Sequence, residues 1–134
     1  MLAKNIARGL MDSGVKAEIF DLSGTSIDDN IIDIIEDSDA LIVGSSTING
    51  DAIKPVWILL ASLATINLRN KIGFAFGTYA CSGEAAKMIE NRMKDLKMKV
   101  PEPFLRAQMI PTEEDLKKSY ETGKKLADII KSSS

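Results

Sequence analysis

The stretch that decides the fold is Ala40-Leu41-Ile42-Val43-Gly44-Ser45-Ser46-Thr47-Ile48-Asn49-Gly50-Asp51. It begins as a short apolar run and ends in small, hydroxylated and turn-forming residues. Such a run, followed by a helical pattern, is typical of a buried parallel strand that opens into a loop. In open α/β sheets, ligands bind outside the carboxyl ends of such strands. The loop from Ser45 to Asp51 is therefore the first place to look for a site.

Length, composition and charge limit the class of protein. The chain has 134 residues, 45% of them hydrophobic and 27% charged, which predicts a single domain over residues 1–134. A formal net charge of −2 argues against nucleic-acid binding, because a basic footprint is missing. The longest apolar run, residues 55–63, is too short to cross a membrane, and the first residues lack the apolar core of a signal peptide. We expect a cytoplasmic protein that binds neither nucleic acid nor a membrane.

The sequence contains few residues of the types that act as nucleophiles or bind metals. Cys81 is the only cysteine, so it has no internal disulfide partner, and the sequence has no histidine. The most common general base and the usual metal-ligand sets are therefore absent. No catalytic residue and no metal site is predicted.

Helical and strand patterns alternate along the chain. Gly14 is a signal for a helix end, and Ser26 with Asp29 and Thr112 with Asp115 resemble capping boxes. The predicted helices cover residues 2–12, 31–36, 53–63, 84–96 and 112–131. The predicted strands cover residues 15–22, 40–44 and 71–77, with an extended segment at 100–110 whose start two prolines confine. This order predicts an α/β fold with a doubly wound parallel sheet and helices on both faces.

Two loops of small residues follow successive predicted strands. The first begins at Ser45, and the second is Thr78-Tyr79-Ala80-Cys81-Ser82-Gly83. Because the two strands should be neighbours, both loops should leave the sheet at one edge. Backbone N–H groups, hydroxyls and little bulk admit a flat heteroaromatic ligand, and Tyr79 offers a ring for stacking. The alternative is that both loops are ordinary connections whose Ser and Thr cap the next helices, and spacing alone does not separate the two interpretations.

Several motifs together resemble the flavodoxin-like FMN domain. They are Gly44-Ser45-Ser46-Thr47-Ile48-Asn49-Gly50-Asp51 with Lys54-Pro55, Lys71-Ile72-Gly73-Phe74-Ala75-Phe76-Gly77-Thr78-Tyr79, Ser82-Gly83-Glu84-Ala85, and Glu114-Asp115-Leu116 with Tyr120 and Gly123-Lys124. The combination covers nearly the whole chain and is most similar to the C-terminal flavodoxin domain of flavodiiron (A-type) flavoproteins. The resemblance implies an FMN-binding electron-transfer domain that works with redox partner proteins. It favours an electron carrier, or a redox domain of an oxidoreductase, over a stand-alone enzyme.

The resemblance also implies which residues grip the isoalloxazine ring. They are Ser46, Thr47, Ile48, Asn49, Gly50, Asp51, Thr78, Tyr79, Ala80, Cys81, Ser82 and Gly83. In the family, a peptide of the first loop turns its carbonyl toward flavin N5 on one-electron reduction. Asn49-Gly50 is the candidate here, because Gly tolerates both backbone conformations. Asp51 is expected to disfavour the anionic reduced flavin or, alternatively, to serve as a helix N-cap or first-turn carboxylate. Cys81 stands where the family often has a tryptophan.

The resemblance begins inside the family's first helix, which residues 1–7 resemble. A flavodoxin starts with a central strand and a Ser/Thr-rich loop that binds the FMN phosphate. We therefore expect a sheet without its first strand, and FMN binding that is weak or absent without the phosphate loop. A homodimer, or a missing N-terminal segment, is expected to complete the sheet.

The sequence leaves one other function open and disfavours two more. A second hypothesis is a degenerate flavodoxin-fold module without FMN that acts in oligomerisation or partner binding. A receiver domain is disfavoured because no early acidic pair precedes a phosphoacceptor Asp. A hydrolase is disfavoured because histidine and a nucleophile elbow are missing.

Overall fold

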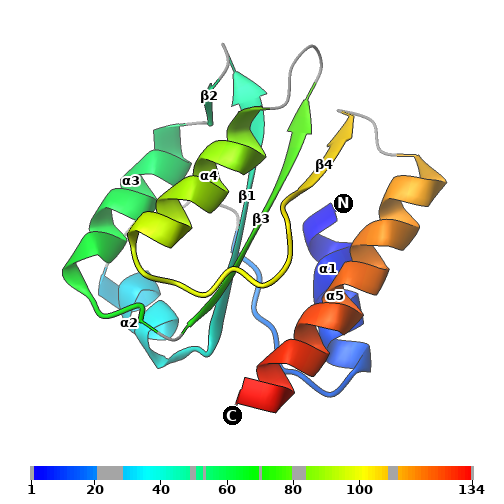
Figure 1. The fold of residues 1–134 in the computed structure, drawn as a ribbon, viewed down its shortest axis with the longest axis horizontal. Helices are drawn as coiled ribbons and strands as arrows, with labels where there is room; N and C mark the ends of the chain where they lie inside the picture. Colours follow the sequence, from blue (N-terminus) through cyan, green and yellow to red (C-terminus); the bar gives the residue numbers. More distant parts are fainter. Residues whose placement is uncertain are drawn as a thin grey trace. The chain divides into compact units, whose positions relative to one another are not determined.

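The computed structural model describes residues 2–20, 29–48, 51–52, 54–69, 71–79, 84–108 and 112–133. The chain forms two compact units, one of Met1–Phe20 with Ala107–Ser134 and one of Asp21–Arg106. The first is built on two helices, and the second holds most of the sheet and three further α-helices (Figure 1).

The helices of the first unit are α1, Leu2–Asp12, and α5, Glu113–Ser133, as predicted. The capping box of α5 is confirmed. The N–H of Asp115 donates to Oγ1 of Thr112 at 3.1 Å, and the N–H of Thr112 donates to the Asp115 carboxylate at 3.0 Å. The capping box expected at Ser26 lies outside the described residues.

Helix α1 ends at Asp12, and Gly14, the helix-end signal of the sequence, follows it. Gly14 has a φ of +90°, which lies in the left-handed region that favours glycine. The N–H of Val15 donates to the carbonyl of Leu10 at 2.9 Å, and the N–H of Gly14 donates to that of Met11 at 3.0 Å. These two bonds satisfy carbonyls that the helix end would otherwise leave unpaired.

Two glycines let the backbones of α1 and α5 touch. A Cβ atom on Gly9 would lie 2.2 Å from the carbonyl oxygen of Tyr120, and one on Gly123 would lie 2.2 Å from that of Ile6. Real Cβ atoms do not approach backbone oxygens so closely. The pair of glycines therefore fixes how near the two helices come to each other.

The sheet has the strand order β2-β1-β3-β4. Strands β1, Ala40–Ile48, and β3, Ile72–Tyr79, are parallel neighbours, and both run further at their carboxyl ends than predicted. Strand β2, Asp51–Ala52, pairs antiparallel with the end of β1 and was not predicted. Strand β4, Leu105–Gln108, lies within the extended segment predicted over residues 100–110, after its two prolines.

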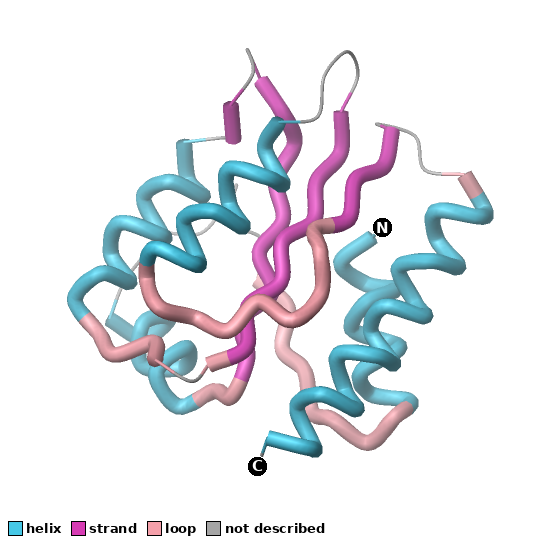
Figure 2. Tube along the Cα trace, viewed as in Figure 1, coloured by secondary structure: helices cyan, strands magenta, loops and turns pink. Residues whose placement is uncertain are grey.

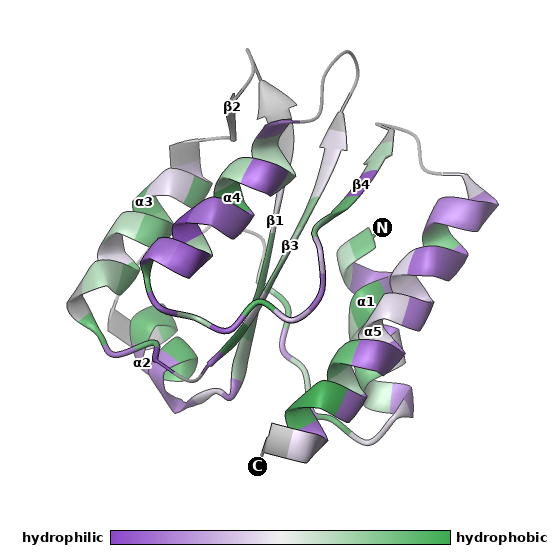
Figure 3. Cartoon of the chain, in the orientation of Figure 1, coloured by the Kyte–Doolittle hydropathy of each residue, from purple (hydrophilic) through white to green (hydrophobic). Residues whose placement is uncertain are grey.

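The second unit has one apolar core. Its helices are α2, Asp29–Asp37, α3, Lys54–Ser62, with the 3₁₀ turn Leu63–Thr65, and α4, Glu84–Asp95, close to the predicted ranges. The core residues come from these helices, from β1 and β3 and from the segments that follow: Ile31, Ile35, Val43, Val56, Leu59, Leu60, Leu63, Leu68, Ala75, Ala85, Ile89, Met93 and Met98. Apolar residues dominate α3, whereas α4 mixes them with hydrophilic ones (Figure 3). Residues of α4, β1 and β3 thus pack together in one core.

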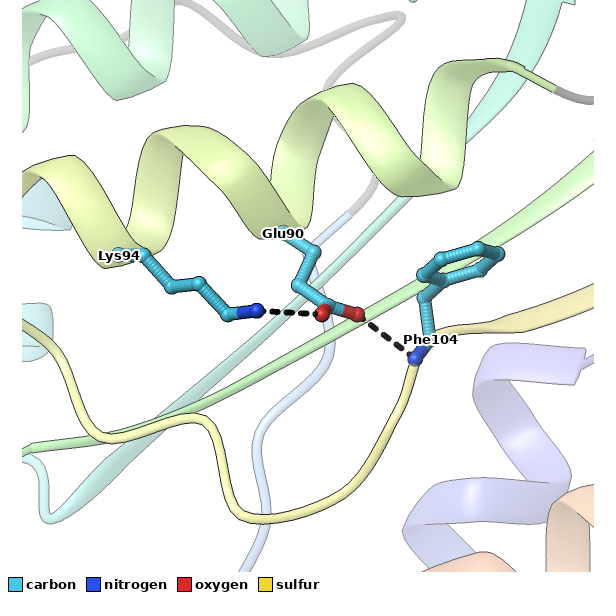
Figure 4. Close-up of polar contacts among 3 residues, drawn as sticks. All are labelled: Glu90, Lys94 and Phe104. Carbon is cyan, nitrogen blue, oxygen red and sulfur yellow. Dashed lines mark hydrogen bonds and ion pairs between the residues drawn. The ribbon is translucent and has the colours of Figure 1, made fainter.

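Two polar contacts tie loops to this core. Nζ of Lys71 donates to the carbonyls of Glu36 and Ser38 at 2.8 and 2.5 Å, which joins the end of α2 to the start of β3. The carboxylate of Glu90, in α4, accepts a hydrogen bond from the N–H of Phe104 at 2.8 Å and pairs with Nζ of Lys94 at 3.0 Å (Figure 4). The second contact holds the chain that leads into β4.

The strand predicted over residues 15–22 is wrong for its described part. Residues 15–20, here called segment 15–20, form neither helix nor strand (Figure 2). Ile19 and Phe20 are 52% and 42% exposed. The composition of the segment favours a strand. A strand is stabilised by pairing with a neighbour, however, and the described sheet, β2-β1-β3-β4, does not include the segment. Asp21 and Leu22 lie outside the described residues, and the missing first strand remains a prediction.

Candidate functional site

The two predicted ligand loops begin at the same edge of the sheet. Ser46 of β1 is the register partner of Thr78 of β3, and the two strands are parallel. Strand β1 ends two residues after Ser46, at Ile48, and β3 ends one residue after Thr78, at Tyr79. The prediction that these strands are neighbours is confirmed, and the chain leaves both at the carboxyl edge, where open α/β sheets bind ligands.

The first predicted loop is shorter than expected. Ser46, Thr47 and Ile48 continue β1, and Ile48 pairs antiparallel with Asp51 of β2. The backbone of Asp51 therefore lies opposite the end of β1. Asn49 and Gly50 lie outside the described residues. An Asn-Gly pair between strand-forming residues is a strong hairpin signal, which could have predicted β2.

The alternative role expected for Asp51 is wrong. Helix α3 begins at Lys54, so Asp51 is neither its N-cap nor in its first turn. Pairing with β1 takes up the backbone of Asp51 before the helix starts. Asp51 therefore belongs to a short strand that follows the carboxyl end of β1.

The second predicted loop lies between β3 and α4. Thr78, which is half-buried, and Tyr79 are the last two residues of β3, and α4 begins at Glu84. Ala80, Cys81, Ser82 and Gly83 lie outside the described residues. Only these four residues connect the strand to the helix, so the amino end of α4 follows closely on the carboxyl edge of the sheet.

Two glycines beside the strand ends were not predicted as part of the site. A Cβ atom on Gly77 would lie 3.0 Å from the carbonyl oxygen of Ser45 and 3.3 Å from Cβ of Ala86. A Cβ atom on Gly44 would lie 2.1 Å from Cζ of Phe76, because the Phe76 ring covers it. Glycine inside a strand is a signal for such close approach. These contacts bring β1, β3 and α4 together just before the two strand ends.

The described residues offer no other obvious centre of chemistry. No group of three potential metal ligands is found among them, and no helix in that part of the chain is long and apolar enough to span a membrane. A hollow of about 240 Å³ on α1 and α5 is lined by Asn5, Arg8, Leu116, Lys117 and Tyr120. It includes none of the predicted cofactor residues.

Tyr120 makes the clearest electrostatic contact of the first unit. Its hydroxyl donates to the carboxylate of Asp12 at 2.5 Å. This hydrogen bond, followed by burial and the negative charge of Asp12, raises the pKa of Tyr120 above its usual 10.0, although Arg8 opposes the shift. The phenol is therefore held in its protonated form, as a hydrogen-bond donor.

The comparisons with known proteins agree on one family. The model of the flavodoxin family matches residues 1–123. The type A flavoprotein fprA of Rhodobacter capsulatus is 42% identical over 128 residues, which are 95% of this chain and 29% of that protein. The chain thus spans about a third of the length of the first curated relatives that it matches.

Solved structures share the fold. A flavodoxin from the domain Archaea superimposes with a TM-score of 0.88 at 30% identity, covering 97% of this chain and 88% of that chain. The Flv1 flavodiiron core from Synechocystis sp. PCC6803 gives a TM-score of 0.92 at 28% identity, covering 99% of this chain and 33% of that one. The predicted flavodoxin-like α/β fold and the similarity to flavodiiron proteins are confirmed. The chain belongs to the flavodoxin family.

Proposed function

We propose that this chain is an FMN-binding electron-transfer domain. The observation that carries the proposal is the register pairing of Ser46 with Thr78, because of which the chain leaves β1 and β3 at one edge of the sheet. Membership of the flavodoxin family and the relative named as a type A flavoprotein support it. FMN, when bound, supplies the one- and two-electron redox chemistry, and the residues of the chain hold and orient its ring.

The described residues fit such a group. The small residues Gly77 and Gly44 draw the strands and α4 together beneath the strand ends, so the backbone at Ser46 and Thr78 is held in a fixed register. Backbone groups positioned in this way can approach a flat ring without obstruction by long side chains. Asp51, opposite the end of β1, supplies a negative charge on the same edge.

Each predicted residue has a proposed role toward the ring. Tyr79 stacks on the isoalloxazine ring. The Asn49-Gly50 peptide supplies a carbonyl that responds to the redox state, and the carboxylate of Asp51 disfavours added negative charge on the ring. Ala80, Cys81, Ser82 and Gly83 are proposed to contribute further contacts to the ring.

The partners are proposed to be redox proteins, and the chain to act as one domain of a larger oxidoreductase. The support is the length of the relatives, of which this chain matches about a third. The partner, or the remainder of such a protein, would hold the second redox centre with which bound FMN would exchange electrons.

A second candidate function is a flavodoxin-fold module that acts in oligomerisation without FMN. The exposed apolar side chains of Ile19 and Phe20 favour it. Titration of the purified chain with FMN, followed by the quenching of flavin fluorescence, separates the two. The electron-transfer proposal expects saturable binding of one FMN per chain. Unchanged fluorescence up to high-micromolar protein contradicts it and leaves the second function.

A further inference from the structure

Gly77 lies near the carboxyl end of β3, directly before Thr78, and is the register partner of Ser45 in β1. A Cβ atom on Gly77 would lie 3.0 Å from the carbonyl oxygen of Ser45, which is tighter than nearly all contacts that real Cβ atoms make. That oxygen belongs to the backbone of a paired strand and cannot turn away alone. A side chain at position 77 therefore requires β1 and β3 to shift relative to each other.

The same glycine lies against the first turn of α4. Its Cβ atom would be 3.3 Å from Cβ of Ala86 and 3.4 Å from the backbone nitrogen of Ala86. Ala85 and Ala86 are buried, so the turn cannot tilt outward without opening the core. Residues 80–83 alone connect the last residue of β3 to the first residue of α4. A shift of α4 relative to β3 therefore changes the span that this short connection must bridge.

We propose, on the basis of the FMN-binding function proposed above, that Gly77 is a positioning residue for the flavin ring. It acts through its neighbours, because its missing side chain sets the spacing of three anchor points. These are the Ser45 peptide before the first predicted loop, Thr78 at the start of the second, and the first turn of α4 after the second. Both predicted ring-side loops are attached at these points, so their spacing determines whether both loops reach the ring at once.

Gly73 provides a matched control within the same strand. It lies four residues before Gly77 and therefore on the same face of β3. A Cβ atom on Gly73 would lie 3.0 Å from Sδ of Met93 and 3.2 Å from Cε of Met98. These atoms are the far ends of flexible side chains, which adapt to an added methyl group. The contacts of Gly77 are with backbone atoms and with Cβ of Ala86, which move only with their strand or helix.

The added methyl group of Gly77→Ala is expected to oppose FMN binding. In the chain without FMN, β1, β3 and α4 shift slightly to accommodate the new Cβ atom. Binding of FMN requires the parent spacing, so the strain of overpacking returns when the ring binds. The usual cost of overpacking corresponds to an FMN dissociation constant that is about five- to 150-fold higher.

The first test measures the dissociation constant of FMN by fluorescence titration for the parent chain, Gly77→Ala and Gly73→Ala. Binding by Gly77→Ala is expected to be at least about fivefold weaker than by the parent chain, and binding by Gly73→Ala to be close to that of the parent. If the parent chain binds FMN but Gly77→Ala is weakened less than this, or no more than Gly73→Ala, the positioning role is overturned and the proposed function stands. A parent chain that binds no FMN overturns both.

Visible circular dichroism of the bound flavin separates positioning of the ring from a simple loss of folded protein. The spectrum depends on the groups around the ring, so Gly77→Ala saturated with FMN is expected to differ from the parent chain, whereas Gly73→Ala is expected to match it. Weaker binding with an unchanged spectrum overturns the proposal. If Gly77→Ala does not fold, the double variant Gly77→Ala with Ala86→Gly, which removes the methyl group at 3.3 Å, takes its place. It keeps the contact with Ser45, so parent-like binding by the double variant overturns the proposal.

Discussion

Ser46 and Thr78 are register partners in the parallel pair of β1 and β3, so two loops that are far apart in sequence start at one edge of the sheet. The relationship depends on backbone pairing along seven residues of each strand. It places the two sequence motifs that resemble flavin-ring loops on neighbouring strands. The proposed site therefore follows from the topology of the sheet.

The substitution Gly9→Ala is expected to destabilise the pair of helices α1 and α5. Its Cβ would lie 2.2 Å from the Tyr120 carbonyl oxygen, so the helices must separate. Overpacking of this kind costs about 1–3 kcal/mol. Urea unfolding measures the loss, and Lys125→Ala, an exposed change on α5, serves as a control with little effect. Equal stability of Gly9→Ala and the parent chain contradicts the close crossing.

The substitution Glu90→Ala is expected to lower the free energy of unfolding by about 1–3 kcal/mol, because it leaves the N–H of Phe104 without its acceptor. Glu90→Gln retains an acceptor oxygen and is expected to cost less. The ion pair contributes little, since the Lys94 side chain is 55% exposed, so Lys94→Ala is expected to cost less than about 1 kcal/mol. Thermal unfolding of the three variants gives the order, and a larger effect of Lys94→Ala than of Glu90→Ala contradicts it.

Lys97 follows α4 with a φ of 71°, the only positive φ of a described residue other than glycine. Its N–H donates to the carbonyl of Lys94, and that of Met98 donates to Met93, so the helix ends with Lys97 in the left-handed conformation. The substitution Lys97→Gly removes the strain of that conformation and is expected to stabilise the chain by about 0.5–1 kcal/mol. A higher melting temperature in calorimetry checks this. Lys99→Gly, in a position without positive φ, is expected to destabilise.

The raised pKa of Tyr120 predicts a pH dependence of stability at alkaline pH. The hydrogen bond to Asp12 needs the protonated phenol, so its contribution is fully present below the unfolded pKa of about 10 and is lost as the pH rises through the higher folded pKa. Tyr120→Phe removes the contribution at every pH. The stability difference between the parent chain and Tyr120→Phe is therefore expected to vanish at strongly alkaline pH, which urea unfolding at several pH values measures. A difference that grows with pH contradicts the assignment.

Local signals predicted most of the elements. The capping box of Thr112 and Asp115 and the helix end at Gly14 depend on residues within a few positions of each other, and both are confirmed. The failure at residues 15–22 has a different cause, because a strand depends on a neighbour that the segment's own sequence does not specify. The carboxyl ends of β1 and β3 were underestimated for the same reason, since Ser46 and Thr78 extend the strands by pairing with each other.

The edge that carries the candidate site could be predicted from the alternation of strands and helices, but its details could not. The position of Asp51 in β2 depends on the antiparallel pairing with Ile48. The close approach of Gly77 to the Ser45 carbonyl depends on strand register and on α4. Both are contacts between segments, which residue spacing along the chain does not determine.

The most direct test of the central claim compares the dissociation constant of FMN for the parent chain and for two tyrosine variants, measured by fluorescence titration. Tyr79, at the end of β3, is proposed to stack on the ring, whereas Tyr120 bonds to Asp12 in α1. Loss of one aromatic stacking contact corresponds to about two- to tenfold weaker binding. We expect saturable FMN binding that Tyr79→Ala weakens by this factor and Tyr120→Phe leaves unchanged. No FMN binding by the parent chain, or equal binding by Tyr79→Ala, would contradict it.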